Sequence, residues 1–209
     1  FLPLNDLIDK YGHNIKKITH EETWKYVMRG NEICAVPSEG QYYKAQTVIR
    51  TDWLEKVGIP YKSHYTLSEF KEILKTFTTQ DPDGNGVNDT YGLGTRPNGG
   101  DWRWTFMAIF GAFGGQPFHY YERDGKVVYW NATDEFRAAI EYCAELYKNG
   151  WVDPECFILN YDQAMLKMVN GKAGVATGWW NIVQSMYSNG FAELNPGGRW
   201  DWIYITSDD

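Results

Sequence analysis

Apolar residues recur along this chain first at helical and then at strand spacing. The clearest helix begins at Thr66, where the letters TLSE form a capping box. Its apolar side chains fall on one helical face: Leu67, Phe70, Ile73, Leu74 and Phe77. Similar spacing, with start and stop residues, predicts further helices over 4–18, 51–57, 102–113, 133–149 and 161–169. In this reading Thr51 and Thr133 are N-caps.

Short runs rich in β-branched and aromatic residues lie between these helices. They predict strands at 33–37, 45–50, 173–177 and 200–206, and the first two look like neighbours in one sheet. Asp124-Gly125 separates 120–123 from 126–130 and is a strong hairpin signal. Strands interleaved with helices predict an α/β fold with helices on both faces of a sheet.

Composition narrows the range of possible functions. The chain has 209 residues, with 20 Lys and Arg against 27 Asp and Glu, so its net charge is −7, which argues against a nucleic-acid or anionic-membrane surface. Cys34, Cys143 and Cys156 have no CxxC spacing and are expected to be buried, neither paired nor bound to zinc. No transmembrane run or signal peptide is present, and the chain lacks an initiator Met, so we expect a fragment or a processed form.

The stretch DPDGNGVND concentrates oxygen ligands at regular offsets. Counting Asp81 as position one, Gly86 is sixth, and the ligand offsets of an EF-hand-type calcium loop fall on Asp81, Asp83, Asn85, the Val87 carbonyl and Asp89. Calcium takes roughly six to eight hard oxygens, and this loop offers no Cys or His. The alternative is a solvated loop of Asx-turns without metal.

The loop departs from a sensor EF-hand. Position twelve is Gly92, so the usual bidentate Glu is missing. One predicted helix precedes the loop, and a strand-like segment follows it. We therefore expect a structural calcium clamp and not a helix pair that opens on binding.

Two clusters join tryptophan to small polar residues: NGGDWRW at 98–104 and GWWN at 178–181. Each lies where a loop meets a regular element, so its side chains can project into a cleft. An aromatic face beside hydrogen-bonding groups suits a sugar ring, which has apolar faces and a hydroxyl rim. The alternative for each tryptophan is an ordinary place in the core.

At these residues the sequence resembles a known family. The segments YTLSEFKEIL, GGDWRWTFMAIFGAFGG, DEFRAAIEYCAELYKNGWVDP and AMLKMVNGKAGVATGWWNI, in this order, resemble family 1 extracellular solute-binding proteins of ABC importers, and LipO-like lipoproteins of Gram-positive bacteria most of all. NGKAG and GWW are similar to the part of maltodextrin-binding proteins that supplies a sugar-stacking Trp. The acidic loop is similar to that of alginate-binding proteins, although Thr90 stands where those have an acid after position nine.

The resemblance implies a lobe of the type II periplasmic-binding-protein fold, with a mixed sheet and helices on both faces. It makes Trp180 the best candidate for sugar stacking, Trp179 the alternative, and Trp102 or Trp104 the residue facing it. The expected ligand-binding residues are Trp180, Trp179, Trp102, Trp104, Asp101, Asn181 and Tyr43.

The resemblance also implies an organisation. Residues 1–44 would be the remnant of a first lobe, 45–50 a hinge strand, 51–199 the second lobe and 200–209 a strand returning toward the first lobe. The expected partners are a carbohydrate, specifically an oligosaccharide, and ABC permease subunits, with no nucleic acid. The expected protein is a monomer at the outer face of the cytoplasmic membrane, held there by a lipid anchor that this chain lacks.

Two other functions stay open from the residues alone. A glycoside hydrolase needs two carboxylates about 5–10 Å apart across the sugar, and only Asp101 and Asp201 lie beside tryptophans. Asp201 falls in the alternating run WDWIYIT and is expected to face solvent. A calcium-stabilised, lectin-like module would bind sugar without transport. We expect a binding protein and no catalytic residues.

Overall fold

The computed structural model describes residues 1–37, 45–95 and 102–209. The chain separates into two compact units, Phe1–Tyr42 and Tyr43–Asp209. Two of the expected ligand-binding residues, Tyr43 and Asp101, lie outside the described residues. None of the helices in the described ranges is long and apolar enough to cross a membrane.

The first unit is small and mostly helical. Its elements are α1 (Asn5–Tyr11), α2 (His13–Ile18), α3 (Glu21–Trp24), the 3-10 turn η1 (Lys25–Val27), β1 (Met28–Arg29) and β2 (Glu32–Ile33). The single helix expected over 4–18 is interrupted at Gly12, whose N–H donates to the Ile8 carbonyl at 2.8 Å and ends α1. A glycine there weakens the helix because it loses more backbone conformational entropy on folding than any other residue.

Strand β2 pairs with β1, and not with the strand at 45–50 as the sequence suggested. Gly30, with φ of +58°, turns the chain directly back, so Ile33 finds its partner at Met28. The prediction of neighbouring strands at 33–37 and 45–50 was therefore wrong. The strand at Ile33 thus pairs across a local turn and not with a strand distant in the sequence.

The second unit is built on a five-stranded mixed sheet of order β4-β9-β3-β8-β5. The strands are β3 (Ala45–Arg50), β4 (His64–Thr66), β5 (Tyr91–Leu93), β8 (Ala173–Trp179) and β9 (Trp200–Thr206). Central β3 runs antiparallel to both β8 and β9, while the outer strands β4 and β5 are parallel to their neighbours.

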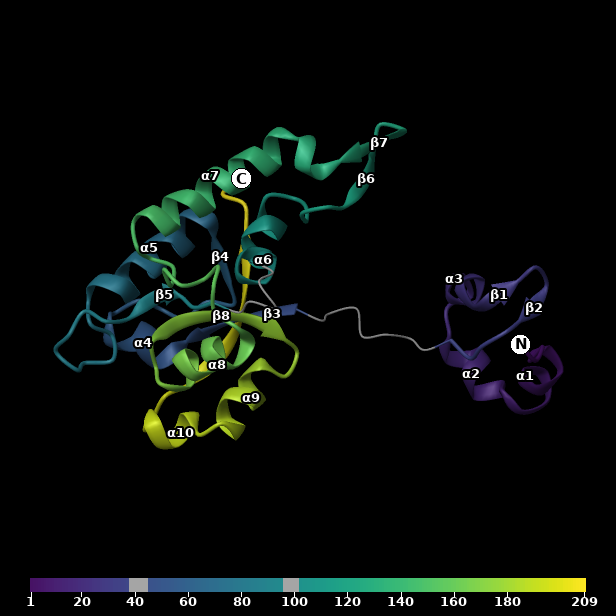
Figure 1. Ribbon diagram of the computed structural model, residues 1–209, viewed down its shortest axis with the longest axis horizontal. Helices are drawn as coiled ribbons and strands as arrows, with labels where there is room; N and C mark the ends of the chain where they lie inside the picture. The colour runs from purple at the N-terminus through teal and green to yellow at the C-terminus, as the bar shows by residue number, and fades with distance from the viewer. Residues whose placement is uncertain (38–44, 96–101) are drawn as a thin grey trace. The chain divides into compact units, whose positions relative to one another are not determined.

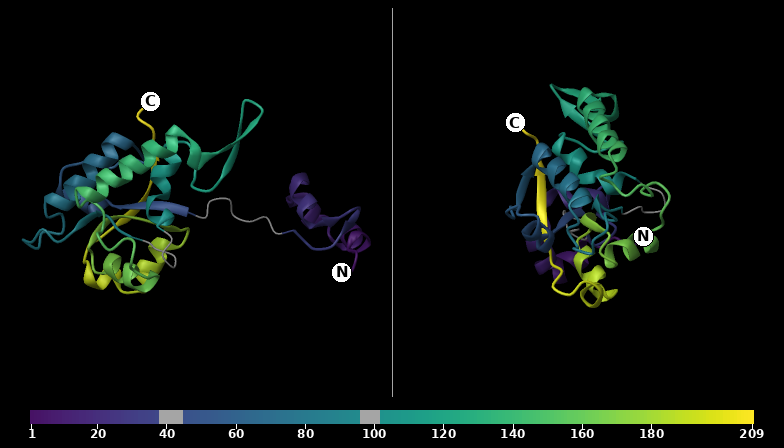
Figure 2. Two further views of the ribbon diagram at one scale, coloured as in Figure 1. Left: turned by 45° about the horizontal axis from the view of Figure 1, so that its top comes forward. Right: turned by 90° about the vertical axis from the view of Figure 1, so that its left-hand side faces the viewer.

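Helices cover both faces of this sheet (Figures 1 and 2). One face carries α4 (Thr51–Lys56), α5 (Leu67–Thr79), α6 (Arg103–Ala112) and α7 (Asp134–Lys148) over the larger apolar core. The other carries α8 (Tyr161–Val169), α9 (Ile182–Ser188) and α10 (Phe191–Leu194) over a smaller one. The predicted α/β class, a mixed sheet with helices on both faces, is confirmed.

Side-chain caps fix the starts of the longer helices. The Thr66 hydroxyl accepts from Glu69 N–H and the Glu69 carboxylate accepts from Thr66 N–H, which completes the expected capping box of α5. Thr133 caps α7 as expected. Thr51 does not cap α4, because Arg50 is the N-cap and Thr51 already lies in the first turn.

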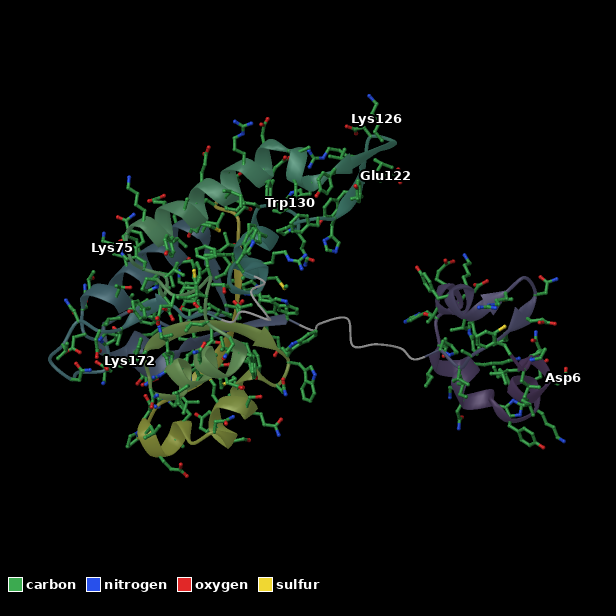
Figure 3. All side chains as sticks on the ribbon, in the orientation of Figure 1. Asp6, Lys75, Glu122, Lys126, Trp130 and Lys172 are labelled. Carbon is green, nitrogen blue, oxygen red and sulfur yellow. The ribbon has the colours of Figure 1, made fainter. Side chains whose placement is uncertain are left out.

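The Asp124-Gly125 hairpin forms as predicted. Strands β6 (Tyr120–Arg123) and β7 (Lys126–Tyr129) are joined by two residues with φ of +54° and +72°, and the 3-10 turn η2 (Trp130–Ala132) follows. The hairpin projects from the body of the unit, with Glu122 and Lys126 on it and Trp130 at its base (Figure 3). Trp130 is 1% exposed, so the hairpin is anchored in the larger core.

Close approach at Gly174 holds β8 against the helices of the larger core. A Cβ there would lie 2.1 Å from Phe77 Cδ2 and 2.7 Å from Trp53 Cε3, so only glycine fits between strand and rings. Cys143 and Cys156 are buried, as expected, and burial raises the pKa of both thiols, whereas Cys34 is only half-buried.

An ion pair lies at the junction between β3 and α4. The Arg50 guanidinium is buried and donates to both oxygens of the Asp52 carboxylate at 2.8 and 2.6 Å. Burial pushes the pKa of Asp52 up, but the hydrogen bonds and charge of Arg50 outweigh it and hold the pKa below its ordinary value.

Candidate functional site

The end of β8 brings tryptophans from two distant parts of the sequence together. Trp179 is the last residue of β8 and lies opposite Ala45 at the start of β3. On the same face of the sheet, two positions back, Thr177 lies opposite Thr47 with their hydroxyls 3.3 Å apart. Trp104, from the first turn of α6, packs on Trp179 with ring centroids 4.7 Å apart. The two clusters noted in the sequence therefore meet here.

Trp180 follows in the turn after β8 and is 56% exposed. An exposed indole offers a face on which a flat apolar ligand can stack, and Trp180 follows Trp179 directly in the sequence. Asn181 precedes α9 as its N-cap residue, with no side-chain capping hydrogen bond within the described part of the chain. Asn181 directly follows the exposed Trp180 in the sequence.

Trp102 has a different setting. It packs edge-on against Phe110 at 5.7 Å and belongs to the border of the larger core. The structure thus pairs Trp104, and not Trp102, with Trp179.

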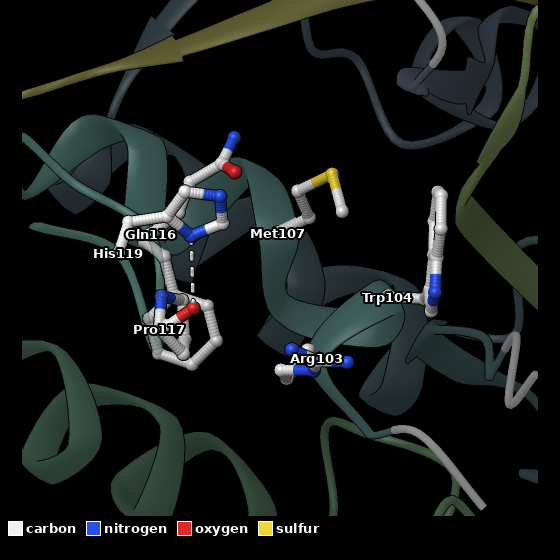
Figure 4. A pocket seen from close by; sticks show the side chains of 7 residues that line it. Arg103, Trp104, Met107, Gln116, Pro117 and His119 are labelled. Carbon is white, nitrogen blue, oxygen red and sulfur yellow. Dashed lines mark hydrogen bonds between the residues drawn. The ribbon is translucent and has the colours of Figure 1, made fainter.

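A pocket of about 270 Å³ lies beside Trp104 (Figure 4). Its lining comes from α6 and from the segment that leads into the hairpin: Arg103, Trp104, Met107, Phe110, Gln116, Pro117 and His119. Sequence reasoning missed the segment 116–119. The only local signal was the sequence GGQPF, in which glycines and a proline stop the helix and turn the chain.

The acidic loop is organised around two side chains. The Asp81 carboxylate accepts from the backbone N–H groups of Gly84, Asn85 and Gly86 at 3.1, 3.1 and 2.9 Å. The Asn85 amide nitrogen donates to Asp83 at 2.9 Å and to Asp89 at 3.2 Å. A single amide thus links two carboxylates that would otherwise repel each other.

Two lysines join this loop to the rest of the unit. Lys172, directly before β8, forms an ion pair with Asp89, and Lys56 of α4 donates to the Asp83 carbonyl at 3.1 Å. Figure 3 shows Lys172 on the loop side of the sheet. Gly92, at position twelve, lies against α5: a Cβ there would be 2.4 Å from the Leu74 carbonyl oxygen. The backbone of α5 therefore excludes any side chain at the position where a Glu is usual.

The carboxylates of the loop titrate differently. The N–H of Gly86 and the neighbouring Asp83 lower the pKa of Asp81. Burial and the proximity of Asp81 raise the pKa of Asp83, while Lys172 and Asn85 lower the pKa of Asp89. Only Asp83 has a raised pKa, and burial is its largest cause.

The chemistry of the loop fits calcium better than its arrangement does. Its donors are carboxylates, an amide and a carbonyl, all hard oxygens. However, no three Asp, Glu, His or Cys side chains are gathered as a metal-binding group anywhere in the described residues. The Asn85 amide lies between the carboxylates of Asp83 and Asp89, and Lys172 also pairs with Asp89.

Asp201, the acid considered for hydrolysis, lies in β9. It pairs in register with Ile49, four positions along β3 from the Ala45 that opposes Trp179. It is half-buried and lies on the same face of β9 as Ile203, which is buried in the larger core, so the expectation that it faces solvent was wrong. Among the described residues, Asp201 is therefore not next to Ala45, the β3 residue that pairs with Trp179.

The profile of the family described as "Bacterial extracellular solute-binding protein" matches residues 1–203. The lipoprotein LipO of Bacillus subtilis strain 168 is 35% identical over 137 residues, which cover 63% of this chain and 26% of LipO. A fructooligosaccharide ABC transporter substrate-binding protein, FusA of Streptococcus pneumoniae, is 27% identical over 191 residues, 85% of this chain and 35% of FusA.

Solved structures of similar proteins share the fold. An "HMO binding ABC-transporter associated Solute Binding Protein" of Bifidobacterium longum infantis superposes with a TM-score of 0.74 at 22% identity, over 99% of this chain and 44% of that one. An "EF-hand mutant" of FusA, in complex with fructo-nystose, superposes with a TM-score of 0.65 at 23% identity, over 99% of this chain and 42% of that one. This chain thus spans about a quarter to a third of the length of the curated relatives and under half of the solved ones.

Proposed function

The chain belongs to the bacterial extracellular solute-binding proteins, and from this premise we propose that it forms one side of a cleft that binds a carbohydrate for import by an ABC transporter. The observation that carries the proposal is the exposed Trp180, which directly follows Trp179 of the packed Trp104–Trp179 pair in the sequence. A sugar stacks its apolar face on such a surface and leaves its hydroxyls to polar neighbours. The name of the relative FusA describes a fructooligosaccharide as its substrate, which is of the same chemical class.

In this proposal the residues have separate roles. Trp180 is the stacking surface, Trp179 and Trp104 support it, and Asn181 offers an amide to the sugar hydroxyls. Trp102, Asp101 and Tyr43 stay in the proposed ligand-binding set.

The proposal includes an organisation of the chain. We assign residues 1–44 to a first lobe, 45–50 to a hinge strand, 51–199 to the second lobe and 200–209 to the strand that returns. Such proteins close two lobes around their ligand by a hinge motion. By this proposal the protein is a monomer, works outside the cell on a lipid anchor, as expected for a Gram-positive bacterium, delivers sugar to permease subunits and is not an enzyme.

We also propose that Asp81, Asp83, Asn85, the Val87 carbonyl and Asp89 hold a structural Ca²⁺. The ion would supply the positive charge that this group of oxygens lacks, and so fix the loop between α5 and β5. Rotation of the Asn85 amide and release of Asp89 from Lys172 would turn these oxygens to the ion. The relative with an EF-hand, and the hard-oxygen donor set of this chain, support the assignment.

A saccharide titration tests the binding function. Calorimetry of the chain with a panel of oligosaccharides should give saturable heats, and chromatography of the same mixtures should show the saccharides unchanged. Accumulating shorter sugars would refute a binding protein and favour the hydrolase. No saturable binding to any member of the panel would refute the carbohydrate proposal.

Thermal unfolding tests the calcium site. The melting temperature should be higher in CaCl₂ than in EGTA, because an ion bound only by the folded state stabilises it. The Asp83→Asn variant should lose this difference. Asp124→Asn is the matched control, since Asp124 lies in the hairpin turn, at a positive φ that Asn tolerates, and should keep the difference. Equal melting curves of the unmodified chain in both buffers would refute the site.

A further inference from the structure

One lysine differs from every other donor to the carboxylates of the acidic loop. The Asp81 oxygens accept from backbone N–H groups, and the Asp83 oxygens accept from the backbone and side-chain amides of Asn85. Asp89 accepts from the Asn85 amide on Oδ1, at 3.2 Å, and its Oδ2 pairs with the Lys172 ammonium. Among the described residues, Lys172 is therefore the one charged donor to these three carboxylates.

Backbone pairing, and not the loop itself, places Lys172 beside Asp89. Tyr91 pairs in register with Ala173, and the Tyr91 N–H donates to the Lys172 carbonyl at 2.9 Å. The Lys172 N–H donates in turn to the Lys167 carbonyl at 3.0 Å. Asp89 lies two residues before Tyr91, so the parallel pairing of β5 with β8 brings this acid and this lysine to the same end of the two strands.

A second lysine contacts the loop in a different way. Lys56 donates to the backbone carbonyl of Asp83 at 3.1 Å, an oxygen that is not among those assigned to calcium. Lys56 and Lys172 thus bring the same charge to the same loop, but only Lys172 occupies an oxygen that the ion would use. This difference makes Lys56 a matched control.

The position of the Lys172 ammonium opposes the binding of a cation. Calcium takes roughly six to eight oxygens, and with Gly92 at position twelve the loop has few to spare. The ammonium occupies Oδ2 of Asp89, and its charge repels a divalent ion held by the same carboxylate. The pair is partly exposed, at 34% for Lys172 and 39% for Asp89, so water can solvate the ammonium when it leaves.

We propose that Lys172 is an internal counter-cation of the acidic loop, which neutralises Asp89 in the absence of calcium, gives way when Ca²⁺ binds, and so sets the affinity of the loop for the ion. The inference rests on the calcium site of the proposed function and adds the residue that regulates it. Without the ion, Lys172 still ties the loop to β8. Without Lys172, the loop depends on the ion for positive charge.

Calcium affinity gives the first test. CaCl₂ is titrated calorimetrically into the 209-residue chain after treatment with EGTA and exchange into metal-free buffer. Lys172→Gln should bind Ca²⁺ about 2- to 10-fold more tightly than the unmodified chain, because one partly exposed charge interaction is removed. Lys56→Gln should change the affinity by less than about twofold. Equal tightening in both variants would make the effect one of overall charge and would overturn the role of Lys172.

Thermal unfolding gives the second test. In EGTA, Lys172→Gln should melt about 1–4 °C below the unmodified chain, because Asp89 has lost its counter-charge. In CaCl₂ this gap should close, because the ion replaces the ammonium and binds only the folded state. Lys172→Arg keeps the charge and should behave as the unmodified chain does. The same gap in both buffers would make Lys172–Asp89 an ordinary surface ion pair and overturn the proposal.

A double-mutant cycle shows whether the effect passes through Asp89. In EGTA, Lys172→Gln should lower the melting temperature of the unmodified chain and leave that of Asp89→Asn unchanged, because the ion pair is already lost there. An equal fall in both backgrounds would contradict the assigned pairing. Lys172→Met carries these tests if Lys172→Gln does not fold, as judged by its melting curve.

The outcomes separate this proposal from the calcium site itself. Calcium binding by the unmodified chain that Lys172→Gln leaves unchanged or weakens would overturn the role of Lys172 and leave the site standing. Binding by Lys172→Gln alone would support the role of Lys172 and overturn the site in the unmodified chain. Binding by neither protein would overturn both proposals.

Discussion

Alanine at Trp180 separates ligand binding from folding in this protein. The indole is 56% exposed, so the remaining part, 100 − 56 = 44%, is covered by the protein. Of the roughly 200–250 Å² of a Trp side chain this is about 100 Å², which at about 25 cal/mol per Å² gives an upper bound of about 2.5 kcal/mol. For a chain of this size each kcal/mol lowers the melting temperature by about 2–4 °C, so we expect a fall of at most about 10 °C and a folded variant.

Relative to its effect on stability, Trp180→Ala is expected to have a larger effect on ligand affinity. Truncation of an aromatic residue that anchors a ligand costs about 1–2 kcal/mol or more, which weakens affinity by a factor of about 5 to 30. Trp179→Ala should weaken binding too, but it should also lower the free energy of unfolding by about 0.5–1.5 kcal/mol more than Trp180→Ala does, because it breaks the ring contact with Trp104.

Two measurements on each variant suffice: calorimetric affinity for the best saccharide of the panel, and the free energy of unfolding in urea. Trp202→Ala is the matched control, since Trp202 is 37% exposed but lies on β9, beyond β3 from the tryptophan pair. It should lose stability and keep its affinity. Unchanged affinity in folded Trp180→Ala, or an equal loss in Trp202→Ala, would refute the assignment of Trp180 as the stacking surface.

Three predictions concern the frame that holds the site. Gly174→Ala should lower the free energy of unfolding by about 1–3 kcal/mol because its Cβ overlaps aromatic rings of the core, whereas Gly111→Ala, in open space on α6, should be neutral or stabilising; equal effects in thermal melts would contradict this. Thr66→Ala should cost about 1 kcal/mol through loss of the capping box, and Thr66→Ser should restore most of it. The folded-state pKa of Asp52 is depressed by Arg50, so its contribution is present above the ordinary pKa of 3.8 and is lost as pH falls through the lower folded value. Asp52→Asn should therefore destabilise the protein near pH 7 and flatten the loss of stability below about pH 4 in urea titrations, and an unchanged acid limb would contradict the ion-pair argument.

Local signals predicted local structure well. The capping box at Thr66 and the Asp-Gly turn of the hairpin are each decided by a few adjacent residues, and both formed as expected. The class of fold followed because apolar spacing alternates between strand and helix along most of the chain. The meeting of Trp104 and Trp179 was suggested only by the resemblance to a family.

Features that depend on distant neighbours were missed. Whether Ile33 pairs with Met28 or with β3 depends on competing partners that the pattern of a single strand does not rank. The pocket is made by α6 and a segment that turns back at Phe118, which has a positive φ. Hydrophobic periodicity does not predict a positive φ at a Phe. Asp201 looked solvent-facing because alternation gives two faces without saying which one a neighbour covers.

The packing of Gly92 against the Leu74 backbone limits how this protein can be redesigned or can evolve. A stronger grip on a metal is usually gained by adding an acid at the twelfth position of such a loop, but here that substitution would push β5 away from α5. Any mutational route to a tighter site has to pass through positions within the loop itself or through Lys172, which competes for Asp89. The contact that joins β5 to α5 therefore excludes an acid at position twelve, so the proposed calcium site can gain an acidic ligand only elsewhere in the loop.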